Sequence, residues 1–239
     1  MMRTLFIIPA RGGSKGIPHK NVKLLQGKPL IAYTLEVARA VADDADICVS
    51  TDDEIIAETV RLYGLDVPFL RPRELATDMA GSYEVIRHAI EFYECQGKYY
   101  DVIVLLQPTS PFRKVEHVIE AMKMFEENRD LDMVVSVKSA ASNPYYDCYE
   151  EDENGFLRIS KGDGRIERRQ DAPAVWEYNG AIYVMSVEVL KAKHLSTFTK
   201  IRPYVMEDIY SVDLDTMLDW QIAELLIKER LVGGYEREY

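Results

Sequence analysis

The sequence predicts an α/β fold in which a mostly parallel sheet is covered by helices on both faces. Its 239 residues match the size of one large α/β domain. Short apolar runs recur along the chain, and segments with helical periodicity separate them. The runs are apolar at consecutive positions, which is typical of strands buried on both faces. Such strand–helix alternation indicates a parallel sheet with helical crossovers.

The first half of the chain contains three predicted strands and four predicted helices. The apolar runs at residues 4–9, 47–50 and 101–106 predict the strands. Asp52 and Asp53 follow the second strand and provide N-cap residues for the next helix, and Ser82 is placed to cap another. The predicted helices cover residues 30–41, 54–63, 82–94 and 115–127.

The second half begins with a predicted strand at residues 133–137, after which the pattern changes. Residues 140–173 are rich in Asn, Asp, Gly, Tyr and Arg and show no helical period, so we expect an inserted β-hairpin region there. A strand is predicted at 179–185, and the last helix at 216–230. The predicted division is therefore an α/β domain of residues 1–139 and 174–239 around an insertion of residues 140–173.

Composition disfavours several classes of partner. The chain has 29 basic and 40 acidic residues and a net charge of −11, whereas proteins that bind nucleic acids or anionic membranes are usually basic. No apolar run approaches the roughly 20 residues that cross a bilayer. Cys48, Cys95 and Cys148 are too widely spaced for a disulfide framework or a metal knuckle. We expect free thiols, and hence a cytoplasmic protein.

The charge is unevenly distributed. Residues 1–35 contain six basic side chains and no acidic one, since the first carboxylate is Glu36. A concentrated positive segment in an acidic protein predicts a local anion site.

The loop after the first predicted strand, PARGGSKGIPHKN at residues 9–21, carries this positive charge. Gly12, Gly13 and a third glycine allow backbone N–H groups to approach a phosphate closely, and Ser14 adds a hydroxyl. The loop matches neither the GxGxxG nor the GxxxxGK[ST] motif. Since ligands bind beyond the carboxyl ends of strands in open α/β sheets, we expect a polyphosphate here, the alternative being an ordinary basic turn. Its cations are Arg11, Lys15 and Lys20.

Asp213 and Asp215 predict a magnesium site. They are two residues apart after Val212, so in an extended chain both carboxylates project from one face. Mg²⁺ prefers such oxygen ligands, and a triphosphate needs a metal to gather its oxygens. The alternative is a solvated acidic turn in which Asp215 caps the helix that begins near Thr216.

Two further segments suggest substrate contacts. Pro108 and Pro111 stiffen the turn after the third predicted strand and fix the direction of Gln107, unless the turn is simply a helix cap. Arg168 and Arg169 could clamp a carboxylate, although paired surface charges are the simpler interpretation. The sequence offers no Ser/His/Asp or Cys/His set for nucleophilic catalysis.

Five motifs occur in register along residues 4–230: IPARGGSKGIPHKN, GKPLIAYT, LLQPTSPFR, RRQD…NGAIY and SVDLDT. Together they resemble the N-acylneuraminate cytidylyltransferases, also called CMP-sialic acid synthetases. The related Kdo cytidylyltransferases share the fold, but their first loop fits less well. The resemblance implies a Rossmann-like nucleotidyltransferase with three layers, and a magnesium-dependent reaction of CTP with a nonulosonic (nine-carbon 2-keto) sugar acid that yields a CMP-sugar and pyrophosphate.

The resemblance also implies roles for individual residues. Lys15, Asp213 and Asp215 would be catalytic, and the two aspartates would hold Mg²⁺. The inserted region would exchange across a homodimer, so that Arg169 would act in the partner's site. The sugar acid would contact Gln107, Arg169 and Asn179. The nucleotide would contact Arg11, Gly12, Gly13, Ser14, Lys15, Lys20, Asn21, Arg71 and Ser82.

Two departures from the family pattern concern the sugar. Tyr146 stands where a lysine near the sugar carboxylate is expected, and residues 194–198 contain one aromatic where an adjacent pair is usual. Legionaminic, pseudaminic, Kdn or Kdo-type acids are therefore alternatives to N-acetylneuraminate. Two alternatives from other classes are a non-catalytic nucleotide-binding module and a structural dimer scaffold.

Overall fold

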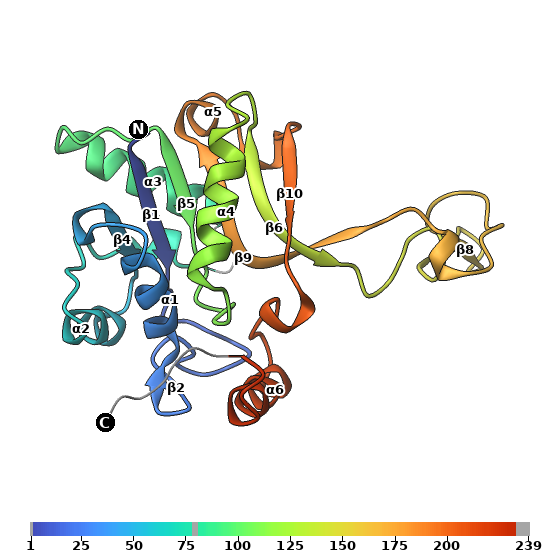
Figure 1. Ribbon diagram of the computed structural model, residues 1–239, viewed down its shortest axis with the longest axis horizontal. Coiled ribbons are helices and arrows are strands. Elements are labelled where there is room, and N and C mark those ends of the chain that lie inside the picture. The colour runs from blue at the N-terminus through green and yellow to red at the C-terminus, as the bar shows by residue number, and fades with distance from the viewer. Residues whose placement is uncertain (1, 78–80, 233–239) are drawn as a thin grey trace.

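A six-stranded sheet forms the centre of the molecule (Figure 1). The computed structural model describes residues 2–77 and 81–232. Across the sheet the strands lie in the order β10–β6–β9–β5–β1–β4. Their bounds are Thr4–Pro9 for β1, Ile47–Ser50 for β4, Val102–Leu105 for β5, Met133–Ser139 for β6, Trp176–Ser186 for β9 and Ile201–Val205 for β10.

The sheet is mostly parallel, as predicted, but one inner strand runs the other way. β1 pairs in parallel with β4 and β5, and β10 pairs in parallel with β6. β9 lies between β5 and β6 and is antiparallel to both. The carboxyl ends of β1, β4 and β5 therefore meet at one edge of the sheet, and β9 enters the body from that same edge.

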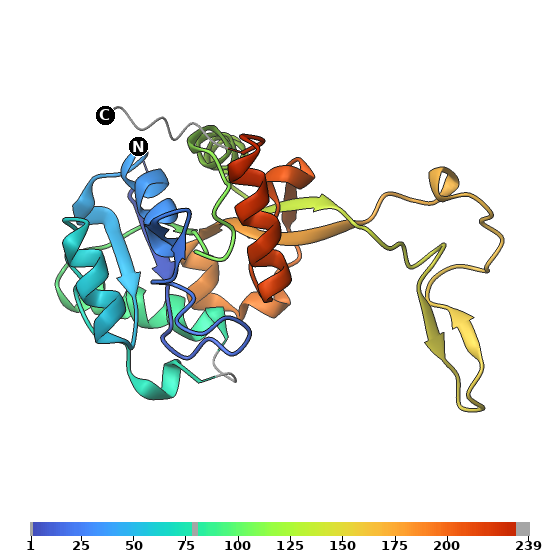
Figure 2. The same ribbon diagram turned by 90° about the horizontal axis from the view of Figure 1, so that it is seen from below.

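Helices cover both faces of the sheet, which confirms the predicted three-layer α/β fold. Side chains of α1 (Leu30–Arg39), α2 (Glu54–Leu62) and α4 (Val115–Glu126) pack in one core cluster with Phe6 and Ile8 of β1. The alternate β1 residues, Leu5 and Ile7, face a second cluster with α3 (Ser82–Cys95) and α5 (Val187–Ala192). A third cluster joins α6 (Met217–Lys228) to the hairpin of β2 (Leu24–Leu25) and β3 (Lys28–Pro29), and Figure 2 shows the layers from below.

One predicted cap is observed, and another predicted cap and the alternative cap role of Asp215 are not. Asp53 caps α2 as predicted, because its carboxylate accepts hydrogen bonds from Ile55 N–H (2.7 Å) and Ile56 N–H (3.3 Å). Gly81 rather than Ser82 is the N-cap of α3, and Thr216 rather than Asp215 caps α6. The Thr216 cap leaves the Asp215 carboxylate available for another role.

Three elements escaped prediction: the β2–β3 hairpin, α5 and β10. Pro203 lies within β10, and a proline in a strand normally argues against that strand because it cannot donate to the ladder. β10 tolerates it because β10 is the edge strand, hydrogen-bonded only to β6.

The segment between β6 and β9 projects from the body as an arm, which both views show (Figures 1 and 2). Its base is the paired end of β6 and start of β9, where Ser139 lies opposite Trp176. Near its tip β7 (Tyr149–Glu151) and β8 (Leu157–Ile159) form an antiparallel hairpin. Among the residues described, no helix is long and apolar enough to span a membrane.

Asp132 joins the start of β6 to the segment before β10, and we expect it to govern acid stability. Partial desolvation alone would raise its pKa. Hydrogen bonds from Lys193 Nζ (2.8 Å) and from the N–H groups of Lys200 (3.0 Å) and Thr199 (2.8 Å) outweigh that effect and lower the pKa to about 2. Because the folded-state pKa is depressed, the stabilisation is present above the ordinary pKa of 3.8 and is lost as the pH falls toward 2.

The corresponding prediction is that Asp132→Asn costs about 2 kcal/mol of unfolding free energy at pH 7 and nearly nothing at pH 2. Denaturant unfolding of both proteins between pH 7 and pH 2 measures the difference. An equal destabilisation at every pH would contradict the ionic origin of this contribution.

Candidate active site

The basic loop after β1 is held in place by backbone contacts. Asn21 is 6% exposed, and its Nδ2 donates to the carbonyl oxygen of Arg11 at 3.0 Å, which fixes the two ends of the loop together. The Gly12 N–H donates to Asp52 Oδ1 at 3.0 Å. A Cβ on Gly12 would lie 2.4 Å from Asp53 Oδ2, so only glycine allows the loop to approach the start of α2 this closely.

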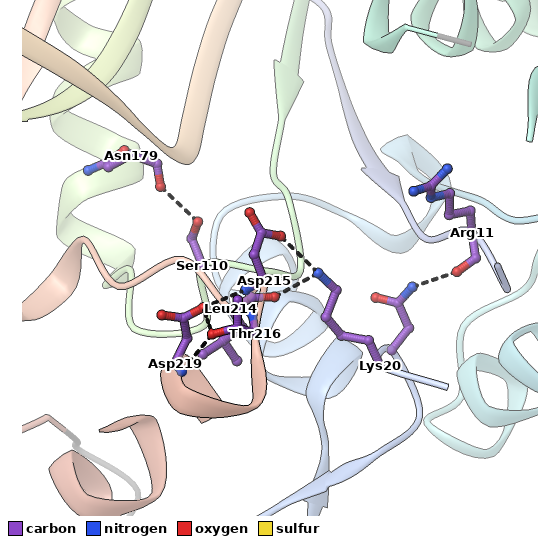
Figure 3. A network of polar contacts seen from close by, with 9 residues as sticks. Arg11, Lys20, Ser110, Asn179, Leu214, Asp215, Thr216 and Asp219 are labelled. Carbon is purple, nitrogen blue, oxygen red and sulfur yellow. Dashed lines mark hydrogen bonds and ion pairs between the residues drawn. The ribbon is translucent and has the colours of Figure 1, made fainter. Parts of the chain in front are cut away.

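Lys20 connects this loop to residues 213–215, the acidic segment, which lies almost two hundred residues later in the sequence. Its Nζ donates to the Leu214 carbonyl oxygen at 2.6 Å and to Asp215 Oδ1 at 3.2 Å (Figure 3). Gly16 brings the two backbones together as well, since a Cβ there would lie 2.0 Å from the Asp215 carbonyl oxygen. The predicted anion loop and the predicted acid pair therefore form one site.

The turn after β5 forms the next wall. Arg113, which is 1% exposed, donates to Thr34 Oγ1 at 2.8 Å and also to the Gln107 carbonyl oxygen, so it ties the turn to α1. The Thr109 carbonyl oxygen accepts from the Leu214 N–H at 2.8 Å. The turn thereby supports both Gln107 and the acidic segment.

These walls enclose a cleft of about 420 Å³ at the carboxyl ends of β1, β4 and β5. Gly12, Gly13, Lys15 and Asn179 do not line it, and Lys15 is exposed. Lys20, in contrast, lines the cleft and contacts Asp215. The predicted residues that do line the cleft are Arg11, Ser14, Lys20, Asn21, Arg71, Ser82, Gln107, Asp213 and Asp215.

Arg71 and Leu75 form another side of the cleft. Arg71 is 6% exposed and donates to the carbonyl oxygens of Ser50 (2.9 Å) and Leu75 (3.3 Å). Burial lowers its pKa, although a guanidinium remains charged at neutral pH. Its buried Nε has no hydrogen-bond partner in the described structure, so it offers a donor to a ligand.

The two aspartates lie in different environments. Leu214 between them is buried, while both carboxylates face outward, as their spacing predicted. Asp213 opens to the cleft but is surrounded by many protein atoms. This desolvation raises the pKa of Asp213, and the neighbouring Asp215 carboxylate raises it further. A hydrogen bond with Thr109 lowers the pKa but does not outweigh the desolvation. The Asp215 side chain is 72% exposed and is paired with Lys20.

This donor set fits a magnesium ion that arrives with its nucleotide. No group of three or more His, Cys, Asp or Glu side chains within the described residues is arranged to hold a metal. Mg²⁺, however, is commonly bound by one or two carboxylates plus substrate phosphates, because it retains waters and avoids all-protein cages. Asp213 and Asp215 can provide those carboxylates beside a cationic loop that can hold the phosphates.

Two predicted sugar contacts lie elsewhere. Arg169 lies in the arm, where it donates to Asp147 Oδ2 at 2.8 Å and to the Ala141 carbonyl oxygen, and it does not line the cleft of its own chain. Asn179 is 2% exposed, and its Nδ2 donates to Ser211 Oγ at 2.9 Å. Its amide therefore points into the protein interior.

Two residues of the site were missed from the sequence. Asp52 was interpreted only as part of a helix cap, although it follows the carboxyl end of β4, where a functional role could have been expected. Tyr183 of β9 lies near Asp213, and burial together with that carboxylate raises the pKa of its hydroxyl to about 12. No sequence signal connects Tyr183 to Asp213.

A second pocket of about 590 Å³ adjoins the cleft and shares Gly81 and Ser82 with it. Its inner wall is apolar and almost completely buried. Polar groups, including Glu84 and His194, occur among its other lining residues. The apolar wall is formed by Leu105, Met133, Met185 and Phe198.

Comparisons with known proteins agree with this architecture. A family model described as cytidylyltransferase matches residues 5–218. The CMP-N,N'-diacetyllegionaminic acid synthase of Legionella pneumophila is 34% identical over 231 residues, which are 95% of this chain and 97% of that protein. The N-acylneuraminate cytidylyltransferase of Streptococcus agalactiae is 37% identical over 222 residues, 92% of this chain but 52% of that protein, so the chain spans about half its length. The pseudaminic acid cytidylyltransferase of Campylobacter jejuni is 32% identical, with 95% and 97% covered.

Solved structures show the same fold at low identity. A CMP:2-keto-3-deoxy-manno-octonic acid synthetase, solved in complex with CTP, superposes with a TM-score of 0.69 at 18% identity and covers 95% of this chain and 99% of its own. The 4-diphosphocytidyl-2C-methyl-D-erythritol synthase of Anaerococcus prevotii superposes with a TM-score of 0.62 at 12% identity, with the same coverage.

Proposed function

Because the chain belongs to the cytidylyltransferase family, we propose that it transfers the cytidylyl group of CTP to a nonulosonic acid and releases pyrophosphate. The main support for this proposal is that Lys20 donates a hydrogen bond to the Leu214 carbonyl oxygen and that Gly16 lies against the Asp215 backbone. It places a cationic, glycine-containing loop and a carboxylate pair on one cleft. This is the arrangement that phosphoryl transfer needs, because positioning and charge stabilisation do most of the work.

The reaction follows from the groups in the cleft. The anomeric hydroxyl of the sugar acid gives its proton to water, its oxygen bonds to the α-phosphorus of CTP, and the bond to the departing pyrophosphate breaks. Arg11 and Ser14 would hold the phosphates, and Arg71 would hold the nucleoside. Asp213 and Asp215 would hold Mg²⁺, which when bound polarises the phosphoryl oxygens. No covalent protein intermediate is needed.

The neighbouring apolar pocket supports an acceptor with an apolar substituent. Its buried wall of leucine, methionine and phenylalanine side chains offers no partner to a hydroxyl group placed against it, but it would accept the methyl end of an N-acetyl group. We therefore favour the N-acylated acids, namely N-acetylneuraminate, legionaminic and pseudaminic acids, over Kdn and Kdo.

A pyrophosphate-release assay tests the function. Each of the four NTPs is combined with Mg²⁺ and a panel of these acids, and we expect turnover with CTP and an N-acylated nonulosonic acid. Tight CTP binding without release of pyrophosphate in the presence of any of the acids would instead identify a nucleotide-binding module.

We propose further that the arm assembles a homodimer. Large apolar side chains on the arm and its base are exposed in the single chain, and a second copy would bury them. Arg169 lies on the same arm and could reach the partner's cleft, whereas it does not line its own. The exposed residues are Tyr149, Phe156, Leu157, Trp176 and Tyr178. The unpaired cysteines suit a cytoplasmic location.

Co-expression of two inactive variants tests whether Arg169 acts in trans. Arg169→Ala and Asp213→Asn chains, carrying different tags, should each be inactive alone. A hybrid dimer would contain one site with both native residues, so random pairing should restore about one quarter of the wild-type activity. Hybrid dimers without any recovered activity would show that Arg169 does not complete the partner's site.

A further inference from the structure

β9 contains an irregular segment beside the cleft. Val135 of β6 lies opposite Tyr183 and Val137 lies opposite Tyr178, so the single residue Ser136 faces residues 179–182. Such an excess of residues on one strand is a bulge, which bends the strand and redirects its side chains. The Ser136 hydroxyl holds the bulge from within, since it bonds to Asn179 Oδ1 at 2.6 Å and accepts from the Ile182 N–H at 2.7 Å.

Asn179 connects the bulge to the acidic segment. Its Nδ2 donates to Ser211 Oγ at 2.9 Å, and that hydroxyl donates to the Glu207 carbonyl oxygen at 2.9 Å. Asn179 and Ser211 are 2% and 1% exposed, so neither side chain can exchange its partner for water. Ser211 lies two residues before Asp213, and the network therefore fixes where the acidic segment begins.

Gly180 is the residue of the bulge that lies beside the cleft residues Gln107 and Asp213. Its φ is +73°, a left-handed conformation that favours glycine. A Cβ at this position would lie 3.0 Å from Gln107 Oε1, 3.1 Å from Ser110 Oγ and 3.6 Å from Asp213 Oδ2. The bare Gly180 backbone is therefore the surface against which these three side chains rest.

We propose that Gly180 and Asn179 are positioning residues: the bulge sets the separation between Gln107 and Asp213, and thereby the fit of the acceptor sugar acid. The inference rests on the proposed function, which assigns Gln107 to the acceptor and Asp213 to the metal. It gives Asn179 a role that acts through Ser211 and the acidic segment instead of by touching the sugar. The side of the cleft around Arg71, which we assign to the nucleotide, does not contact the bulge in the described part of the chain.

Gly180→Ala and Gly97→Ala form a matched pair. Gly97 has a φ of +75°, and a Cβ there would meet nothing within 4 Å, so both variants carry the same backbone strain but only Gly180→Ala crowds the site. We expect similar losses in melting temperature. Gly180→Ala should raise KM for the sugar acid at least tenfold and leave KM for CTP within twofold, while Gly97→Ala should change neither. A KM for the sugar acid within twofold of wild type in folded Gly180→Ala would overturn the proposal.

A second pair keeps the test decisive if Gly180→Ala does not fold. Ser211→Ala removes the hydroxyl acceptor of the Asn179 amide and leaves only the weaker acceptor Met206 Sδ at 3.4 Å. Ser186→Ala removes one hydrogen bond, from the Val189 N–H, at the far end of β9. Ser211→Ala should lower kcat at least fivefold with KM for CTP unchanged, whereas Ser186→Ala should affect stability alone. Equal kinetics in the two variants would refute the positioning role. Failure of the wild-type protein to release pyrophosphate would refute the proposed function itself.

Discussion

Asp213→Asn is expected to lower kcat by about 10²–10³-fold, the scale of losing one preorganised group that stabilises transition-state charge. The replacement keeps the side-chain shape but removes a carboxylate that faces the cleft beside Asp215 and Lys20. An amide is a poor ligand for Mg²⁺ compared with a carboxylate, so the nucleotide phosphates would lose their metal. Steady-state pyrophosphate release at saturating CTP and varied Mg²⁺ measures the effect.

Asp208→Asn is the matched control for this change. Asp208 lies in the same segment, and its carboxylate takes part in no hydrogen bond or ion pair within the described chain, so its kcat should stay within twofold of wild type. The melting temperature of Asp213→Asn should also remain near wild type. A kcat for Asp213→Asn as high as that of Asp208→Asn would remove Asp213 from the metal-binding role.

Gly16→Ala should be nearly as damaging, although glycine contributes no functional group. The added methyl would lie 2.0 Å from the Asp215 carbonyl oxygen, which is far too close for two nonbonded atoms. The loop and the acidic segment must therefore separate, and Lys20 would lose its contacts with Leu214 and Asp215. Misplacement of reacting groups by about 1 Å can cost about 10²-fold in rate.

Gly13→Ala in the same loop separates crowding from loop stiffness. A Cβ on Gly13 meets nothing within 4 Å in the described structure, so any effect there would arise from the chain's reduced flexibility. We expect a kcat loss for Gly16→Ala that is at least tenfold larger than that for Gly13→Ala. Comparable losses in the two variants would show that the close contact with Asp215 is not required.

The central strands were predictable because burial leaves a simple signal. β1 and β4 are apolar at successive positions, and the structure begins and ends both where the runs do. The direction of β9 was not predictable, since a buried strand has the same composition in either orientation. β10 was missed because Pro203 suits only an edge strand, and edge position is a property of the whole sheet.

The individual segments of the candidate site could be predicted from the sequence, but the contacts between those segments could not. The rule that ligands bind beyond strand ends located the loop around Arg11 and the turn around Gln107. The Lys20–Asp215 pairing could not be inferred from spacing, because it depends on how α6 packs under the loop. The interior orientation of Asn179 was equally hidden, since a buried amide and a substrate-binding amide look alike in sequence.

The continuity of β9 has a mechanical consequence. One strand of eleven residues begins at the root of the arm with Trp176, passes through Asn179 and Gly180, and ends deep in the body at Ser186. In the proposed homodimer, a force applied to the arm by the second copy would reach Gly180, beside Gln107 and Asp213, within four residues of the arm's base. If the arm assembles the proposed homodimer, subunit association and turnover should rise and fall together, and dilution below the dissociation constant of the dimer should abolish activity before the protein unfolds.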